Sequence, residues 1–117
     1  MIVKRIVPNI HTPEMEKARA FYQDALGLTL LMDHGWIATY GSKEYSQVQI
    51  SVASQGGSGT ETPELSIEVD DIEEAYERMQ QAGFPIVYGP VNEPWGVRRF
   101  FVRDPYNKLV NILAHIS

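Results

Sequence analysis

The sequence has 117 residues, of which 44% are hydrophobic and 21% charged, and it contains no cysteine. This composition is typical of one soluble globular domain, and the lack of cysteine excludes disulfides, thiolate metal sites and cysteine nucleophiles. The net charge is −5 without a basic patch, and no apolar run approaches the roughly 20 residues of a membrane helix. We therefore expect no nucleic-acid or membrane partner, no signal peptide, and a cytoplasmic location.

The first half of the chain predicts a β-α-β-β-β order. Residues 2–10 are rich in β-branched side chains and indicate a strand. Thr12 as N-cap and Pro13 in the first turn predict a helix that ends at Gly27. Its apolar residues recur at helical spacing: Met15, Ala18, Phe21, Tyr22, Ala25 and Leu26. Strands are then expected at 28–32, 36–40 and 47–53, which completes module one, residues 1–53.

The same order is expected to repeat after a linker. Residues 54–63, SQGGSGTETP, are small and polar and predict a flexible connection. Module two, residues 64–117, begins with a strand at 64–69. Asp70 as N-cap, with Glu73 in the capping-box position, predicts a helix that Gly83 ends. Strands are expected at 85–88, 97–103 and 108–115.

This duplication predicts the fold. The phrases AFYQDALGLTLL and AYERMQQAGFPIV, around the two helix ends, look alike, as in a repeated supersecondary unit. We therefore predict an α+β fold in which two βαβββ modules form a curved mixed sheet cup, within a single domain spanning residues 1–117. Sheet edges that need cover favour a homodimer. Pairing of the modules within one chain or between two chains stays open.

Two segments carry a family resemblance. ARAFYQDALGL is similar to the motif A-x-x-F-Y-x-x-x-L-G-[FL], and NEPWGVRRFFVRDPYNKLV is similar to E-x-W-G, a strand, D-P-x-G-N and a final strand. Both motifs belong to the vicinal oxygen chelate superfamily, also called the glyoxalase, bleomycin-resistance and dioxygenase group. The resemblance covers essentially the whole chain. Asn107 stands where the family usually has Gly, and Asn tolerates the left-handed backbone of such a turn.

The resemblance implies a possible metal site. Enzymes of this superfamily hold one divalent metal, such as Ni, Mn, Fe or Zn, through side chains on four equivalent strands. Here the first position falls near Arg5 or Val7, which cannot coordinate a metal. The other positions fall on Gln49, which fits better than the alternative Gln47, and on Glu64 and Asn111, a weak set of one carboxylate and two amides. We therefore expect no metal cofactor, with these three residues as the ligands if a metal binds.

Without a metal, the expected site is a cavity for a hydrophobic or cationic small molecule, and any catalytic residue is unknown. Aromatic faces and cationic groups mark the expected ligand contacts, which are Trp95, Trp36, Tyr40, Arg5, Arg98, Phe100 and Asn111. On the strand at 97–103, Arg98 and Phe100 share the face that we expect to line the cavity. The opposite face, with Arg99, Phe101 and Arg103, is expected to lie toward solvent.

These observations leave three functional hypotheses. The first is a metal-independent small-molecule binding protein resembling the bleomycin-resistance-like members of the superfamily. The second is a metal-dependent lyase, isomerase or dioxygenase, and the third is a non-catalytic accessory dimer. Whether the protein is an enzyme stays open, because the fold hosts unrelated functions.

Overall fold

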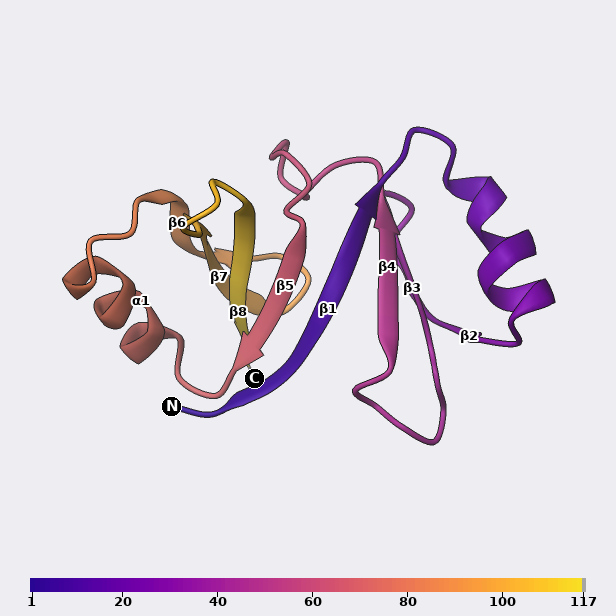
Figure 1. Cartoon of the computed structure of the whole chain (residues 1–117), viewed down its shortest axis with the longest axis horizontal. Coiled ribbons are helices and arrows are strands. Elements are labelled where there is room, and N and C mark those ends of the chain that lie inside the picture. Colours follow the sequence, from indigo (N-terminus) through magenta and orange to yellow (C-terminus); the bar gives the residue numbers. More distant parts are fainter. Residues whose placement is uncertain (117) are drawn as a thin grey trace. The chain divides into compact units, whose positions relative to one another are not determined.

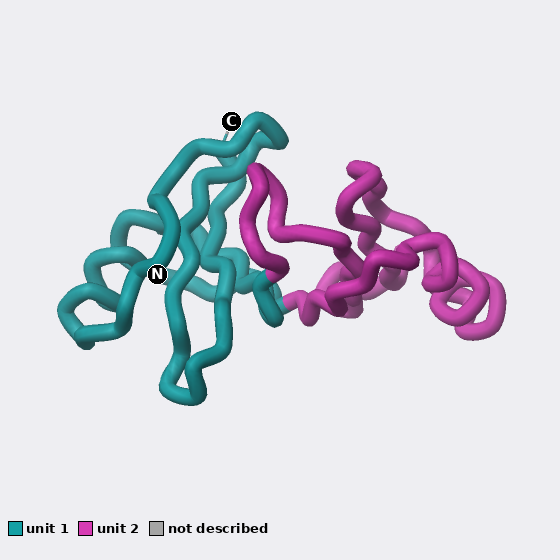
Figure 2. The backbone as a smooth tube through the Cα atoms, turned by 90° about the horizontal axis from the view of Figure 1, so that it is seen from above, with its two compact units in different colours: residues 1–6, 63–117 teal, residues 7–62 magenta. Residues whose placement is uncertain are grey.

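The computed structural model of the protein describes residues 1–116, and its chain divides into two compact units. Unit 1 comprises Met1–Ile6 and Pro63–Ser117, and unit 2 comprises Val7–Thr62 (Figure 2). The first strand, β1 (Val3–His11), contributes its first residues to unit 1 and the rest to unit 2. The unit boundaries therefore differ from those of the two modules, since residues 1–6 group with the second half and residues 54–62 with the first.

Unit 2 contains a sheet in the order β2 (Thr29–Asp33), β3 (Ile37–Gly41), β4 (Gln49–Ala53) and β1. The hairpin strands β2, β3 and β4 are antiparallel, and β4 runs parallel to β1 with Ser51 opposite Asn9. The expected strands are all present, with ends that shift by one or two residues.

The helical segment of unit 2 is not the regular α-helix that the sequence predicts. A 3₁₀ turn, η1 (Met15–Lys17), is followed by a wider π-type helix, η2 (Arg19–Ala25), in which Leu26 N donates to Phe21 O over 3.1 Å. In a wider turn, residues three apart no longer share a face. Phe21, which the helical spacing grouped with the apolar stripe, is therefore not buried with it, and its side chain is 61% exposed. The segment packs on the sheet mainly through Met15, Ala18 and Tyr22.

Unit 1 places one helix against one face of its sheet. The strands lie in the order β5 (Leu65–Val69), β8 (Leu109–His115), β7 (Val97–Arg103) and β6 (Ile86–Glu93), and β5 and β8 are parallel. The helix α1 (Ile72–Gln81) covers the face that carries the main apolar core (Figure 1). That core comprises Val69, Ile72, Ala75, Phe100, Val102, Val110, Ile112 and Ala114.

The start of α1 differs from the predicted capping box by one residue. Asp71 is the N-cap, and its side chain accepts a hydrogen bond from Glu74 N over 3.1 Å. The expected cap, Asp70, instead accepts a hydrogen bond from Ile2 N over 2.7 Å. Either of two adjacent aspartates can serve as the N-cap. The contact of Asp70 with Ile2 is a tertiary interaction, so the local capping pattern could not predict which aspartate caps the helix.

Two other segments depart from expectation. β6 continues past the predicted end at Tyr88 as far as Glu93, because irregular pairing with β7 accommodates Gly89 and Pro90. The predicted flexible linker forms a turn in which Gly56 N donates to Thr60 O over 2.7 Å. The α+β class and the two βαβββ modules are confirmed. No helix within residues 1–116 has the length and hydropathy needed to span a membrane.

Candidate functional site

The sheet of unit 1 has a polar face opposite α1. Alternation along the strands sends Phe100 and Ile112 toward the helix and their neighbours in sequence to the other side. Because Ser66 pairs with Asn111 and Glu68 pairs with Leu113, these strands add polar groups to the same helix-free face. The polar side chains there come from four strands: Arg5, Ser66, Glu68, Arg99, Asn111 and His115.

Arg99 lies at the centre of an aromatic and ionic cluster on this face. Its Nε and Nη2 each lie 2.6 Å from Glu93 Oε2, and Tyr88 Oη donates to the same oxygen over 3.0 Å. The guanidinium carbon lies 4.9 Å from the Trp95 ring centroid and 4.7 Å from that of Phe101. A planar cation suits such stacking, and the charge is balanced by one carboxylate.

The predicted orientation of β7 is therefore wrong. Arg99 and Phe101, expected to face solvent, are 3% and 2% exposed, whereas Phe100 is enclosed beneath α1. Arg98 lies on the helix side, where its Nε donates to Glu73 Oε1 over 2.6 Å. The alternating pattern identified the two sets of residues on β7, but the packing of α1 decided which set lies toward the helix.

A second polar cluster on this face surrounds Glu68. Its carboxylate lies 2.6 Å from Arg5 Nε, 2.8 Å from His115 Nδ1 and 3.8 Å from Lys4 Nζ. Burial by itself would raise the pKa of Glu68, but the His115 hydrogen bond and the charges of Arg5, His115 and Lys4 hold that pKa below its ordinary value. The cluster thus keeps a largely buried carboxylate ionised. The guanidinium of Arg5, which was expected to contact a ligand, forms an ion pair with Glu68.

The side chains at the implied metal positions do not fit a metal. Glu64 is exposed and lies 3.6 Å from Lys108 Nζ, and Gln49, which belongs to unit 2, donates through Nε2 to Ser46 O over 2.7 Å. Asn111 donates through Nδ2 to Ser66 Oγ over 3.1 Å. Its buried Oδ1 has no hydrogen-bond partner within residues 1–116, but a single amide oxygen is a weak ligand. No group of three His, Cys, Asp or Glu side chains in the described chain is placed to hold a metal.

The remaining expected ligand residues lie in different surroundings. Trp95 flanks the Arg99 guanidinium on unit 1. In unit 2, Trp36 stacks beside His34 with ring centroids 6.3 Å apart, and Tyr40 is 5% exposed beneath the helical segment. The structure therefore brings Trp95, Arg5 and Asn111 onto the helix-free face of unit 1, while Tyr40 lines a pocket in unit 2.

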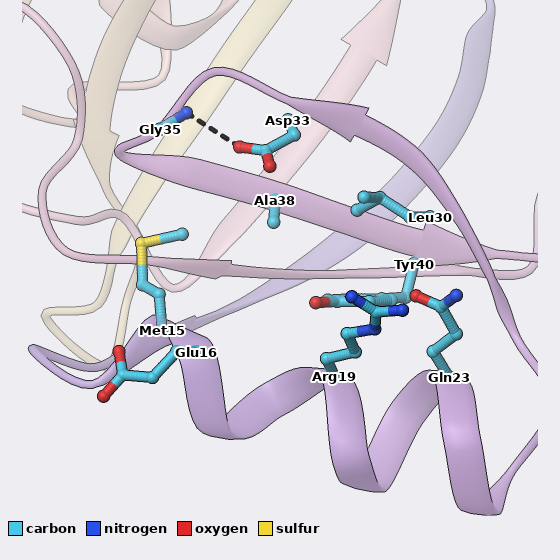
Figure 3. A pocket seen from close by; sticks show the side chains of 9 residues that line it. All are labelled: Met15, Glu16, Arg19, Gln23, Leu30, Asp33, Gly35, Ala38 and Tyr40. Atoms are coloured by element: carbon cyan, nitrogen blue, oxygen red, sulfur yellow. Dashed lines mark hydrogen bonds between the residues drawn. The ribbon is translucent and has the colours of Figure 1, made fainter.

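That pocket has a volume of about 620 Å³ and lies between the helical segment and the β2–β3 hairpin (Figure 3). Side chains from the helical segment form one wall, and the hairpin forms the other. The lining residues are Met15, Glu16, Arg19, Gln23, Leu30, Asp33, Gly35, Ala38 and Tyr40. The helical segment packs on the sheet mainly through Met15, Ala18 and Tyr22, and the pocket lies beside these contacts, over β2 and β3.

Opposite charges occupy different parts of the pocket. Figure 3 shows Arg19 and Gln23 reaching from the helical segment toward Tyr40, and Asp33 and Gly35 at the hairpin turn. Asp33 Oδ1 accepts a hydrogen bond from Gly35 N over 2.8 Å, which fixes the carboxylate at that turn. This pocket does not coincide with the cavity that the sequence predicts. The four-residue spacing of Arg19 and Gln23, which indicates a polar stripe on the helical segment, is the sequence signal that marks it.

Comparisons with known proteins agree with the architecture. Residues 3–112 match the family model of the Glyoxalase/Bleomycin resistance protein/Dioxygenase superfamily. A solved structure described as an NAD-dependent benzaldehyde dehydrogenase from Legionella pneumophila is similar, with TM-score 0.75, 16% identity, and coverage of 94% of this chain and 98% of that chain. No curated protein matches the sequence significantly.

Two further solved structures share the fold. Methylmalonyl-CoA epimerase from Mycobacterium tuberculosis has TM-score 0.66 and 16% identity, with coverage of 98% of this chain and 88% of that chain. The Mn(II)-bound glyoxalase from Novosphingobium aromaticivorans has TM-score 0.66 and 13% identity, with coverage of 98% of this chain and 39% of that chain. At such identities the likeness shows the fold alone.

Proposed function

The chain belongs to the Glyoxalase/Bleomycin resistance protein/Dioxygenase superfamily, and from this premise we propose that it is a metal-independent protein that binds a small molecule. The fold by itself selects no activity, so the proposal depends on the site. In this proposal the protein sequesters its ligand, as the bleomycin-resistance-like members of the superfamily do, and no reaction is part of the proposal.

The observation that carries this proposal is the pocket in unit 2. Its volume of about 620 Å³ lies within the roughly 300–1,000 Å³ of small-molecule sites. Leu30, Ala38 and the ring of Tyr40 supply apolar surface, and a few polar side chains stand around it. This combination of apolar surface with few polar groups is what binding sites for small organic molecules have in common.

Metal independence is supported by the chemistry of the implied ligand positions. Glu64 has Lys108 beside it, Gln49 is bonded to its own loop, and Asn111 is a neutral amide. To bind a metal, the Glu64 carboxylate would have to give up its ion pair with Lys108. The other two side chains could offer only neutral amide oxygens, which are weak ligands for a transition metal. A metal-dependent reaction, as the Mn(II)-bound glyoxalase suggests for this fold, is the alternative.

Binding can be tested with a fragment set read by ligand-observed NMR. The set holds neutral, anionic and cationic aromatic compounds of similar size, and we expect several to bind at millimolar or lower concentration. Leu30→Trp narrows the pocket and should weaken that binding by about tenfold, as expected for steric loss of a contact site. Val87→Trp, at an exposed strand position of unit 1, is the matched control. Equal binding to wild type and Leu30→Trp would contradict the proposal.

A homodimer is also proposed. β2 is the terminal strand of the unit 2 sheet, and its Leu31, which does not line the pocket, is 40% exposed. Phe21 and Leu26 from the helical segment add two side chains that are each 61% exposed. Apolar side chains at a sheet edge favour association. Light scattering during size-exclusion chromatography should give twice the chain mass for the wild type and the mass of one chain for Leu31→Asp. A monomeric wild type would refute the proposed homodimer.

The proposed compartment is the cytoplasm. It is supported by the lack of cysteine, because a chain without disulfides does not need an oxidising compartment to fold. Fractionation of the source cells, with the protein followed by antibody, tests this assignment.

A further inference from the structure

We propose that the unit 2 pocket selects an apolar monocarboxylate, held through Arg19, and rejects a second negative charge at the far end of the ligand. This inference rests on the proposed small-molecule function and names the ligand class for the same pocket. The ligand is identified here by its chemistry, an aromatic or aliphatic body with one carboxylate.

Arg19 is the first support for a carboxylate. Seven of the other lysines and arginines form ion pairs, and Arg103 is hydrogen-bonded. Among the lysines and arginines of residues 1–116, only Arg19 and Lys43 have neither an ion pair nor a side-chain hydrogen bond, and of these two only Arg19 lines the pocket. A guanidinium binds a carboxylate through two parallel hydrogen bonds, so an unpaired one at a cavity favours such a group.

Gln23 reinforces this end of the pocket. It follows Arg19 by four residues on the helical segment, and both side chains reach toward Tyr40 (Figure 3). An amide N–H can donate to the same carboxylate that the guanidinium binds. Two donors from one helical segment would thus hold one end of the ligand while its apolar body lies against Leu30 and Ala38.

The acidic residues decide the other end. Asp33 lines the pocket at the hairpin turn, where Gly35 N holds its carboxylate, and Glu16 lies one turn before the cationic end of the segment. Neither acid forms an ion pair within the described chain. A ligand with a second carboxylate at its far end would meet like charge, whereas a neutral or cationic far end would not.

The test uses a matched series of probes and isothermal titration calorimetry. The probes are 3-phenylpropanoate, its neutral amide, its derivative with a second carboxylate at the para position, and its derivative with an aminomethyl group there. We expect the monoanion to bind about tenfold tighter than the amide, and the dianion to bind more weakly than the monoanion. The aminomethyl compound should bind at least as tightly as the monoanion.

Variants assign these preferences to the residues. Arg19→Gln should remove the preference for the acid over the amide, and Arg19→Lys should keep part of it. Lys43→Gln is the matched control, because it removes the same charge at a residue that does not line the pocket. Asp33→Asn retains the oxygen that accepts from Gly35 N but removes the negative charge. It should therefore reduce the difference in affinity between the dianion and the monoanion. Far-ultraviolet circular dichroism confirms that each variant is folded.

Two failures can be told apart. If acid and amide bind equally, or if Arg19→Gln and Lys43→Gln behave alike, the carboxylate inference is overturned while a small-molecule pocket stands. If no probe binds and the neutral fragments also fail, the inference falls together with the proposed function.

Discussion

Arg99 and Glu93 form an ion pair across 2.6 Å whose side chains are only 3% and 4% exposed. Removing one partner leaves the other charge buried, which typically costs about 3–5 kcal/mol. We therefore expect Glu93→Gln to lower the free energy of unfolding by roughly that amount, measured by urea denaturation. Arg99→Met with Glu93→Gln should cost less than the two single changes added together. Additive losses would show that the pair is not coupled.

Glu68 should make stability depend on acid pH. Its folded-state pKa lies below the ordinary 4.5, because the His115 hydrogen bond and the charges of Arg5, His115 and Lys4 outweigh its burial. A lowered pKa stabilises the fold while the carboxylate is ionised, and that stability is lost as pH falls through the folded-state pKa.

The matched variant for this prediction is Glu68→Gln. The gap in unfolding free energy between wild type and variant should be widest above the ordinary pKa of 4.5 and should shrink as the pH falls from there through the lowered folded-state pKa. Chemical denaturation at several pH values measures it. A gap that is constant over this range would refute the assignment of Glu68 as the titrating group.

Asp71, rather than Asp70, should control the start of α1. Replacing an N-cap with alanine costs about 1 kcal/mol, so Asp71→Ala should destabilise the protein by that amount and Asp71→Ser should restore most of it. Hydrogen exchange gives a local readout, because Glu74 N is bonded to Asp71 Oδ1. The Glu74 amide should exchange faster in Asp71→Ala and be unchanged in Asp70→Ala; the reverse result would restore the capping box at Asp70.

Asn107 occupies a left-handed turn, with φ of 62°. A β-carbon in that conformation costs roughly 1–2 kcal/mol for most residues, and asparagine offsets part of it. Thermal unfolding should show that Asn107→Ala is destabilised by about 1 kcal/mol and that Asn107→Gly is as stable as wild type or slightly better. Equal stability of the alanine and glycine variants would mean that backbone conformation does not limit this turn.

Metal loading should leave the protein unchanged. After incubation with Ni, Mn, Fe or Zn, mass spectrometry is expected to find only trace metal, with no gain in melting temperature, because Glu64 and Lys108 pair and the other donors are amides. About one metal per chain, lost in Glu64→Ala but kept in Glu77→Ala, would support the metal-dependent alternative instead.

The sequence by itself determined the order of the elements. Two-residue alternation marked β7, and the capping residues and Gly83 marked α1. The positive φ expected at Gly27, Gly83 and Asn107 is present at 79°, 82° and 62°. These are local signals, since each depends on residues within one turn or one strand. The family resemblance rested on the same local segments, and the family match over residues 3–112 confirms it.

Only the tertiary structure decided the sites. Alternation separates Arg98 from Arg99 but does not say which of them lies beneath a helix, and the packing of α1 reversed the expected assignment. In unit 2, likewise, Phe21 of the π-type helix is exposed, and Arg19 of the same helix lines a pocket with residues of the β2–β3 hairpin. A strand or helix carries two faces in its sequence, but the choice of the covered face is made by long-range packing, because burial of apolar area depends on residues far apart in the chain.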